Sequence, residues 1–305
     1  MKAVIAGGTG LLGRALGSAL ARDGWDVVAL TRQPRAAASI ESGVQLVEWD
    51  GRSGAGSWAL ELAGADAVID LCGASVGTWP WTAGTRRTLR ASRLEPRQAI
   101  VAALEALAPA QRPVVFLAAS GTDGYVGSDA QPATEGTPPA DTFLGRLCRD
   151  WEAEAAKAEP LGLRVVHARI SAVIARGAPV MERLTLPVRL GVGGRIGFGE
   201  QWFSWVHIDD AVGAMRLLLV DPSIRGPVNI ASPGALQQVE VARTLGTILH
   251  RPSFVWTPAP LLRLVLGGQA DLVLGSRRVS PALIQAAGFR FVWTDFGVAA
   301  RDALG

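Results

Sequence analysis

Residues 1–16 read MKAVIAGGTGLLGRAL and decide the fold, because an apolar run leads directly into a loop with four glycines. The run KAVIAG at 2–7 predicts a buried strand. The next segment, LLGRALGSALARDG at 11–24, predicts a helix that ends at a glycine. DVVALTR at 26–32 then predicts a second strand. A strand, a glycine loop, a helix and a second strand in this order predict a βαβ unit.

The glycine loop predicts a binding site for a dinucleotide. It fits Gly8-x-Gly10-x-x-Gly13 and equally Gly7-x-x-Gly10-x-x-Gly13. A side chain at Gly10 would collide with a pyrophosphate, while Gly13 lets the helix pack close to the sheet. The N–H groups of the first helical turn would then face the phosphates. An ordinary tight turn is the alternative interpretation. The cofactor contacts that we expect from this loop are Gly7, Gly10, Leu11, Leu12 and Gly13.

The end of the second strand indicates which dinucleotide binds. An Asp or Glu there would bind a free ribose 2′-hydroxyl, but this position is Thr31, followed by Arg32 and then by Arg35. A guanidinium pairs with a phosphate through two parallel hydrogen bonds. The sequence therefore favours NADP(H) over NAD(H) as the cofactor, with Thr31 and Arg32 at the 2′-phosphate. A solvated arginine on a turn is the alternative.

The rest of the first half repeats the alternation of strand and helix. Helical patterns lie around 85–107 and 143–160. Further strands are predicted at VQLVEWD (44–50), DAVIDLCG (66–73), RPVVFLAAS (112–120) and RVVHARIS (164–171). This alternation predicts an α/β fold of the Rossmann type, in which crossover helices cover both faces of a doubly wound parallel sheet.

The regular alternation of strand and helix patterns ends after about Arg176, where a glycine-rich stretch precedes a tail rich in proline and leucine. We read that tail as a smaller C-terminal lobe on the substrate side. The predicted dinucleotide-binding domain comprises residues 1–175 plus about 205–232, and the predicted smaller lobe comprises about 176–204 and 233–305.

The composition of the chain argues against several classes of binding partner. The 305 residues carry a net charge of +3 without a basic block, so we expect no nucleic-acid partner. Only two cysteines occur, which favours a reducing, cytoplasmic setting. The apolar run APLLRLVLGG at 259–268 is interrupted by Arg263 before it reaches membrane-spanning length, and we expect no membrane partner and no targeting segment. No His, Cys and Asp cluster has metal-ligand spacing, so we expect no metal. The sequence is compatible with an oligomer.

Several segments resemble the extended branch of the short-chain dehydrogenase/reductase superfamily. They are GGTGLLG (7–13), DLCGAS (70–75), and QWFSWVHIDDAVGAM (201–215) followed by GPVNIAS (226–232). The segments RASRLEPRQAIVAAL (90–104), GRLCRDWEAEA (145–155) and RVSPALIQAAGFRF (278–291) resemble its epimerase-like family, related to NAD-dependent epimerases and dehydratases, with a short C-terminal extension.

The resemblance implies a Rossmann fold, NADP(H) binding and an undefined substrate. It places Asp50 near the adenine, and Cys72, Gly73 and Ala74 near the cofactor phosphates on the nicotinamide side. It also makes His207 a structural residue. We further expect four tryptophans to rim the substrate cleft: Trp79, Trp81, Trp202 and Trp205.

The superfamily's catalytic Tyr-x-x-x-Lys pair is missing. By spacing, its tyrosine falls at Cys148 and its lysine at Glu152. A carboxylate one helical turn away is expected to raise the pKa of the Cys148 thiol and keep it protonated. Cys148 as a small buried hydrophobe is the alternative.

Hydroxyls at the end of the fifth strand are the other candidates. Ser120 and Thr122 lie where a group that polarises the substrate carbonyl, or touches the cofactor, is needed, although strand-end hydroxyls are often turn caps. Tyr125, the only tyrosine of the chain, is the best substitute acid, with packing as the alternative.

Three functions follow from these residues. The first is an NADP(H)-dependent oxidoreductase that reduces a small carbonyl or related substrate, with Tyr125, Thr122 or Cys148 as its catalytic group. The second is a non-catalytic protein that binds or senses NADP(H). The third is a nucleotide-sugar epimerase, which the missing tyrosine and Arg32 disfavour.

Overall fold

A computed structural model describes residues 1–33, 43–125 and 131–305, and Arg35 lies outside these residues. Among them, seven strands form one parallel sheet in the order β10-β6-β5-β4-β1-β2-β3. The strands are β1 (Lys2–Ala6), β2 (Asp26–Thr31), β3 (Val44–Glu48), β4 (Ala67–Asp70), β5 (Val115–Gly121), β6 (Arg164–Ile170) and β10 (Gly226–Ile230). This arrangement confirms the predicted Rossmann-type sheet.

The strand order reverses beside β1. Val4 of β1 pairs with Val28 of β2 on one side and with Val68 of β4 on the other. The connections that leave β1 and β4 therefore diverge to opposite sides. In doubly wound sheets ligands bind at the carboxyl ends of the strands at such a point, and we call this region the crevice.

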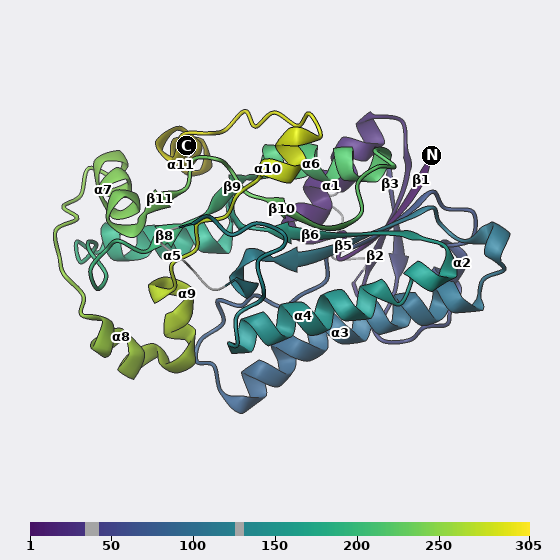
Figure 1. The fold of residues 1–305 in the computed structure, drawn as a ribbon, viewed down its shortest axis with the longest axis horizontal. Helices are drawn as coiled ribbons and strands as arrows, with labels where there is room; N and C mark the ends of the chain where they lie inside the picture. Colours follow the sequence, from purple (N-terminus) through teal and green to yellow (C-terminus); the bar gives the residue numbers. More distant parts are fainter. Residues whose placement is uncertain (34–42, 126–130) are drawn as a thin grey trace.

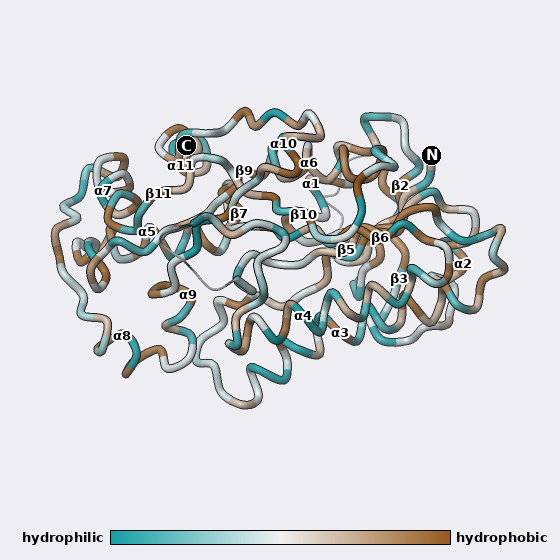
Figure 2. The backbone as a smooth tube through the Cα atoms, viewed as in Figure 1, coloured by the Kyte–Doolittle hydropathy of each residue, from teal (hydrophilic) through white to brown (hydrophobic). Residues whose placement is uncertain are grey.

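Helices cover both faces of the sheet (Figure 1). One face carries α3 (Ala83–Ala106) and α4 (Phe143–Ala156), and the other carries α1 (Leu11–Arg22) and α6 (Ile208–Val220). Because neighbouring residues of a strand point to opposite faces, Ile5 packs on the α1 and α6 side and Val4 on the α3 and α4 side. The short α2 (Ser57–Leu60) follows β3. Figure 2 shows hydrophobic residues along the strands of this core.

The smaller C-terminal region has two short sheets and its own helices. Parallel β7 (Ala172–Ile174) and β9 (Trp205–His207) form one sheet, and antiparallel β8 (Trp202–Phe203) and β11 (Leu236–Gln237) form the other. The helices are α5 (Pro179–Arg189), α7 (Gln238–Ile248), α8 (Ala259–Leu266), α9 (Asp271–Leu274), α10 (Ala282–Ala286) and α11 (Phe296–Leu304). Within the described residues, no helix is long and apolar enough to cross a membrane.

The aromatic rim expected around the cleft is wrong for Trp205. This side chain is fully buried, packs edge-on against Phe296 and donates its indole N–H to Gly234 O at 2.7 Å. It is part of the core of the C-terminal region because β9 pairs on β7 and turns the indole toward α11. Trp79 is exposed, whereas Trp202 is partly covered by the Arg278 guanidinium.

Candidate functional site

The glycine loop joins β1 to α1 and packs tightly on the end of β4. Gly7 has φ +75°, and a Cβ there would lie 2.9 Å from the Leu71 carbonyl oxygen. A Cβ on Gly13 would lie 2.7 Å from Gly8 Cα, so this glycine lets α1 approach the loop. Gly10 differs, because its Cβ would meet only Gly7 O, at 3.2 Å. Among the described residues, none other than Gly7 approaches the position of a Cβ on Gly10.

The amino end of α1 is free to accept an anion. Gly10 caps the helix without a side-chain hydrogen bond, and the first turn contains no acidic residue. No described carboxylate accepts a hydrogen bond from the backbone N–H groups of this first turn, and a helix amino terminus favours negative charge. This end of α1, with the open space at Gly10, fits the pyrophosphate of a dinucleotide.

Arg32 follows β2 at the edge of the same crevice. The Thr31 hydroxyl accepts a hydrogen bond from the Gln33 N–H at 3.2 Å. Burial raises the pKa of the Cys72 thiol, and the positive charges of Arg97 and Arg32 act against that rise. Arg32 makes no hydrogen bond or ion pair with a described residue. It is a cation without a partner in the described chain, which suits a ribose 2′-phosphate.

Asp50 follows β3 and closes a turn. The N–H groups of Arg52 and Ser53 both donate to its Oδ1 at 2.8 Å, and these bonds hold the pKa of Asp50 below its usual value. One carboxylate oxygen is thus committed to the loop. A contact between Asp50 and the adenine stays a prediction.

A buried ion pair fixes the ends of β4 and β5. Arg97 of α3 donates to Asp70 Oδ2 at 2.8 Å, and both side chains are fully buried. Arg97 also donates to Ala119 O at 3.0 Å and to Trp151 O at 2.9 Å. The other oxygen of Asp70 accepts the Cys72 N–H at 2.9 Å. One guanidinium therefore joins β4, β5 and α4 below the crevice.

The turn after β4 is held by α3. Ala74 donates its N–H to the Ser92 hydroxyl at 3.0 Å and accepts a bond from Arg93 at 3.1 Å. The Arg93 guanidinium lies 3.2 Å from the position of a Cβ on Gly73. The predicted cofactor residues Cys72, Gly73 and Ala74 therefore lie in a rigid turn at the crevice, and their contact with a cofactor stays a prediction.

A polar row crosses the carboxyl end of the sheet. Arg169 of β6 is the register partner of both Ser120 on β5 and Asn229 on β10. Glu152 of α4 lies over this row and accepts from Arg169 at 2.8 Å and 2.7 Å and from the Ser120 hydroxyl at 2.6 Å. Tyr125 completes it, because its hydroxyl accepts from Arg169 and donates to Asn229 Oδ1, each at 2.7 Å. We call these five residues the polar row.

The charges of the polar row settle two protonation states. Burial opposes ionisation of Glu152, but its hydrogen bonds with Arg169 outweigh that effect and hold its pKa below the usual value. Burial raises the pKa of Tyr125, and the contact with Arg169 acts against this rise. At neutral pH Glu152 is therefore a carboxylate and Tyr125 keeps its proton.

Cys148 lies on α4, one turn before Glu152. Burial raises the pKa of its thiol to about 11, and the charges of Asp123 and Glu152 add to the effect. The direction agrees with the sequence-based expectation, but burial is the largest cause. The thiol lies 3.6 Å from Gly121 O, to which it donates weakly. It is protonated at neutral pH and is a poor nucleophile.

The Thr122 carbonyl accepts the Tyr125 N–H at 3.1 Å, but the Thr122 hydroxyl bonds to no residue of the polar row. This residue belongs to the 3₁₀ turn η3 (Thr122–Gly124), and its hydroxyl lies 3.2 Å from the Ser171 hydroxyl in a buried pair. This bond joins the chain after β5 to the chain after β6. A catalytic role for Thr122 stays a prediction.

A cavity of about 270 Å³ opens between the end of β5 and α4. Its lining residues are Gly121, Gly124, Tyr125, Thr137, Pro139, Cys148, Arg149, Glu152 and Arg169. Two predicted catalytic groups, Tyr125 and Cys148, thus face the same cavity. Sequence reasoning missed Arg169 and Asn229, although an arginine within a buried strand is a signal that a buried anion lies nearby.

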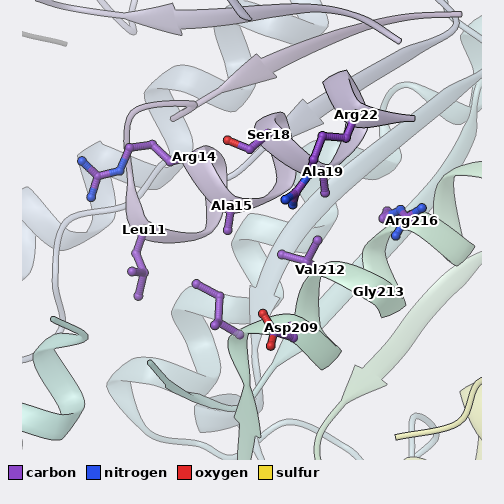
Figure 3. A pocket seen from close by; sticks show the side chains of 11 residues that line it. Leu11, Arg14, Ala15, Ser18, Ala19, Arg22, Asp209, Val212, Gly213 and Arg216 are labelled. Atoms are coloured by element: carbon purple, nitrogen blue, oxygen red, sulfur yellow. The ribbon is translucent and has the colours of Figure 1, made fainter. Parts of the chain in front are cut away.

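A second hollow, of about 500 Å³, lies between α1 and α6 (Figure 3). Its lining residues include Arg14, Ala15 and Arg22 of α1 and Gly213 and Arg216 of α6. Leu11 is the single predicted cofactor residue among its lining residues. None of the five polar-row residues lines this hollow. The larger of the two volumes therefore does not identify the candidate catalytic site.

His207 has a structural role, as expected. It caps α6 by accepting the Asp209 N–H at 3.3 Å, and its ring stacks on Trp293 with centroids 3.9 Å apart. Within the described residues, no group of three or more His, Cys, Asp or Glu side chains could hold a metal ion.

Comparisons with known proteins agree with this geometry. Residues 3–231 match the NAD dependent epimerase/dehydratase family, and residues 257–303 match a domain of unknown function. The chain is 32% identical to an epimerase family protein of Staphylococcus haemolyticus over 303 residues, which are 99% of this chain and 98% of that protein. A relative from Staphylococcus saprophyticus is 33% identical over 301 residues, which are 98% of each chain.

Solved structures share the whole fold. Human epimerase family protein SDR39U1, solved with NADPH, superposes with a TM-score of 0.84 at 28% identity over 99% of both chains. A nucleoside-diphosphate sugar epimerase from Corynebacterium glutamicum has a TM-score of 0.78 at 28% identity, over 100% of this chain and 58% of that one. UDP-glucose 4-epimerase from Thermus thermophilus, at 16% identity and a TM-score of 0.79 over 100% of this chain and 98% of that one, shares the fold alone.

Proposed function

Because the chain belongs to the NAD dependent epimerase/dehydratase family, whose members bind NAD(P), we propose that it is an NADP(H)-dependent oxidoreductase that reduces a small carbonyl or related substrate. The observation that carries the proposal is the Tyr125 hydroxyl in the wall of the 270 Å³ cavity, 2.7 Å from the Arg169 guanidinium. A protonated phenol beside a fixed cation is what a proton donor to a forming alkoxide requires.

Residues at the crevice supply the cofactor site in this proposal. Gly10 leaves room for the pyrophosphate at the amino end of α1, and Arg32, whose guanidinium has no partner among the described residues, would bind the 2′-phosphate. NADPH, when bound, supplies the hydride. The human relative solved with NADPH supports this cofactor, while NAD appears in the names of other structures with the same fold.

The chain's own groups handle the proton. Tyr125 gives its proton to the substrate oxygen, and the Arg169 N–H that already reaches the phenol oxygen stabilises the phenolate as it forms. Glu152 holds Arg169 in place through two hydrogen bonds. Cys148, protonated and facing the same cavity, is the second candidate donor.

The test combines binding and turnover on purified protein. NADPH and NADH are titrated by intrinsic tryptophan fluorescence, and NADPH oxidation is then followed with a panel of aldehydes, ketones and quinones. The proposal expects at least tenfold tighter binding of NADPH and turnover with a member of the panel. Tight NADPH binding without turnover on the whole panel would contradict the oxidoreductase.

That outcome would favour the second candidate, a protein that binds or senses NADP(H) without turnover. The observation that favours it is the commitment of the polar row's hydrogen bonds to one another: Tyr125 already donates to Asn229, and Ser120 to Glu152. A nucleotide-sugar epimerase, the activity in the name of the Corynebacterium structure, is the third candidate, and the missing catalytic tyrosine and the presence of Arg32 after β2 disfavour it.

The proposal also assigns cofactor binding and substrate binding to different parts of the chain. Residues 1–175 with about 205–232 would form the cofactor domain, and about 176–204 with 233–305 the substrate-side lobe. The short β7–β9 sheet, which these bounds assign to the cofactor domain, packs into the core of the C-terminal region. Both cysteines are free thiols, which supports a reducing, cytoplasmic location.

A further inference from the structure

Helix α8 presents apolar side chains to solvent. None of its eight residues is buried, although seven of the eight are apolar. Leu262 and Leu266 are partly covered on the inner side, whereas Leu261, Leu264 and Val265 are exposed. These three positions are spaced i, i+3 and i+4 and thus share one outer face. A helix that is apolar on both sides is not a stable surface helix in water unless something covers it.

Aromatic side chains extend this face. Phe198 is 87% exposed, Phe254 is 82% exposed, and Trp256 is also exposed. Trp256 donates its indole N–H to Gly197 O at 2.9 Å, and a Cβ on Gly197 would lie 3.6 Å from Ala259 Cβ at the start of α8. Trp256 and Gly197 therefore lie beside the start of the helix, Phe198 directly follows Gly197, and Phe254 lies two residues before Trp256. We define the apolar patch by its exposed residues Phe198, Phe254, Trp256, Leu261, Leu264 and Val265.

The chain segments that contain the patch carry net positive charge. Segments 186–200 and 250–266 contain one carboxylate, Glu200, and four arginines: Arg189, Arg195, Arg251 and Arg263. None of these four guanidinium groups makes a hydrogen bond or ion pair with a described residue, and Arg195 instead lies 6.0 Å from the centre of the Trp256 ring. Across a two-fold axis such a patch would face its own positive charge, which disfavours a second copy as the occupant.

We propose that the apolar patch binds the surface of an anionic lipid bilayer. Arginines beside leucine, phenylalanine and tryptophan match segments that lie in the bilayer interface. Leu264, like Phe254, is 82% exposed, so these side chains stand clear of the protein, whereas anchor residues of protein interfaces fill packed pockets. A fluid bilayer needs no matching pocket, and anionic lipids complement the free arginines.

This proposal revises the expectation of no membrane partner. That expectation came from the length of APLLRLVLGG at 259–268, which is too short to span a bilayer. Length does not test whether the segment lies flat on a membrane. Figure 1 places α8 at the edge of the molecule, at the end opposite to α2, and Figure 2 shows hydrophobic residues there, so a flat surface could reach the helix.

The test is co-sedimentation of the whole chain with vesicles. One preparation is phosphatidylcholine alone, and the other is phosphatidylcholine with phosphatidylglycerol. We expect at least tenfold tighter binding to the phosphatidylglycerol vesicles at low salt, weakened by added salt. Leu264→Glu should reduce this binding at least tenfold. Arg263→Glu should reduce it roughly fivefold or more by weakening attraction to anionic lipid.

Val292→Glu is the matched control, because Val292 is 80% exposed but lies outside the patch, and this variant should bind like the wild type. Circular dichroism checks that every variant is folded. The proposal is overturned if the wild type binds neither vesicle, if it binds both equally, or if Leu264→Glu binds like the control. It is also overturned if light scattering finds a dimer that Leu264→Glu dissociates, since a second copy would then be the occupant.

Discussion

Replacing Tyr125 by phenylalanine separates a catalytic phenol from a structural one. The change removes one oxygen from the polar row and with it the two 2.7 Å hydrogen bonds to Asn229 and Arg169. Asn229 keeps its bond to Ser280 O, and Arg169 keeps both bonds to Glu152. The lost bonds should therefore cost about 1–3 kcal/mol of unfolding free energy, which denaturant titration measures.

The effect on turnover should be larger in proportion. A lost general acid typically slows the chemical step by about a hundredfold to ten-thousandfold, so kcat for NADPH oxidation should fall by that factor while the Kd for NADPH stays within about twofold. Cys148→Ala and Thr122→Val, measured beside it, should be less damaging. If Tyr125→Phe loses stability but keeps its kcat, the phenol is only a structural link. Full activity in all three variants would refute the catalytic assignment altogether.

Four further outcomes are expected. Arg32→Ala should remove the preference for NADPH over NADH in fluorescence titrations, and an unchanged preference would exclude the 2′-phosphate contact. Gly10→Val should abolish cofactor binding without unfolding the chain, because a Cβ there meets only Gly7 O while a branched side chain fills the pyrophosphate space. Arg97→Leu should cost about 3–5 kcal/mol in denaturant unfolding, because it leaves a buried carboxylate unpaired. Burial lowers the pKa of His167 from its ordinary value of 6.5 to about 4, so the unfolded chain binds more protons than the folded chain between these pH values. The free energy of unfolding should therefore fall as the pH drops from 6.5 to 4, and His167→Gln should flatten that slope.

The fold could be predicted from the sequence because its signals are local. The glycine loop, the strand before it and the helix after it lie within the first 31 residues, and the structure has β1, α1 and β2 there. Predicted helix ends were less accurate: the pattern around 143–160 becomes α4, which ends at Ala156. The boundary depends on how α4 packs, which the local pattern does not specify.

The candidate site could be predicted only in part. Spacing along α4 placed Cys148 and Glu152 correctly on one face toward the end of β5, since helical spacing is a local property. Arg169 and Asn229 could not be found in this way, because they meet Ser120 only through the register of β5, β6 and β10. The burial of Trp205 has the same cause, since it depends on pairing between β9 and β7.

The buried ion pair between Asp70 and Arg97 also limits how this sequence can change over time. Neither residue can be replaced alone without leaving a charge in the dry interior, yet a pair of neutral side chains that fit the same space would be tolerated. Any substitution route away from this pair therefore passes through an unstable intermediate or needs two simultaneous changes. Because the same guanidinium also holds the ends of β5 and α4 through Ala119 and Trp151, such a double replacement would release the wall that carries Cys148 and Glu152. During evolution, substitutions of Asp70 and Arg97 should therefore be rare and should occur together. They should also be accompanied by substitutions at the candidate site.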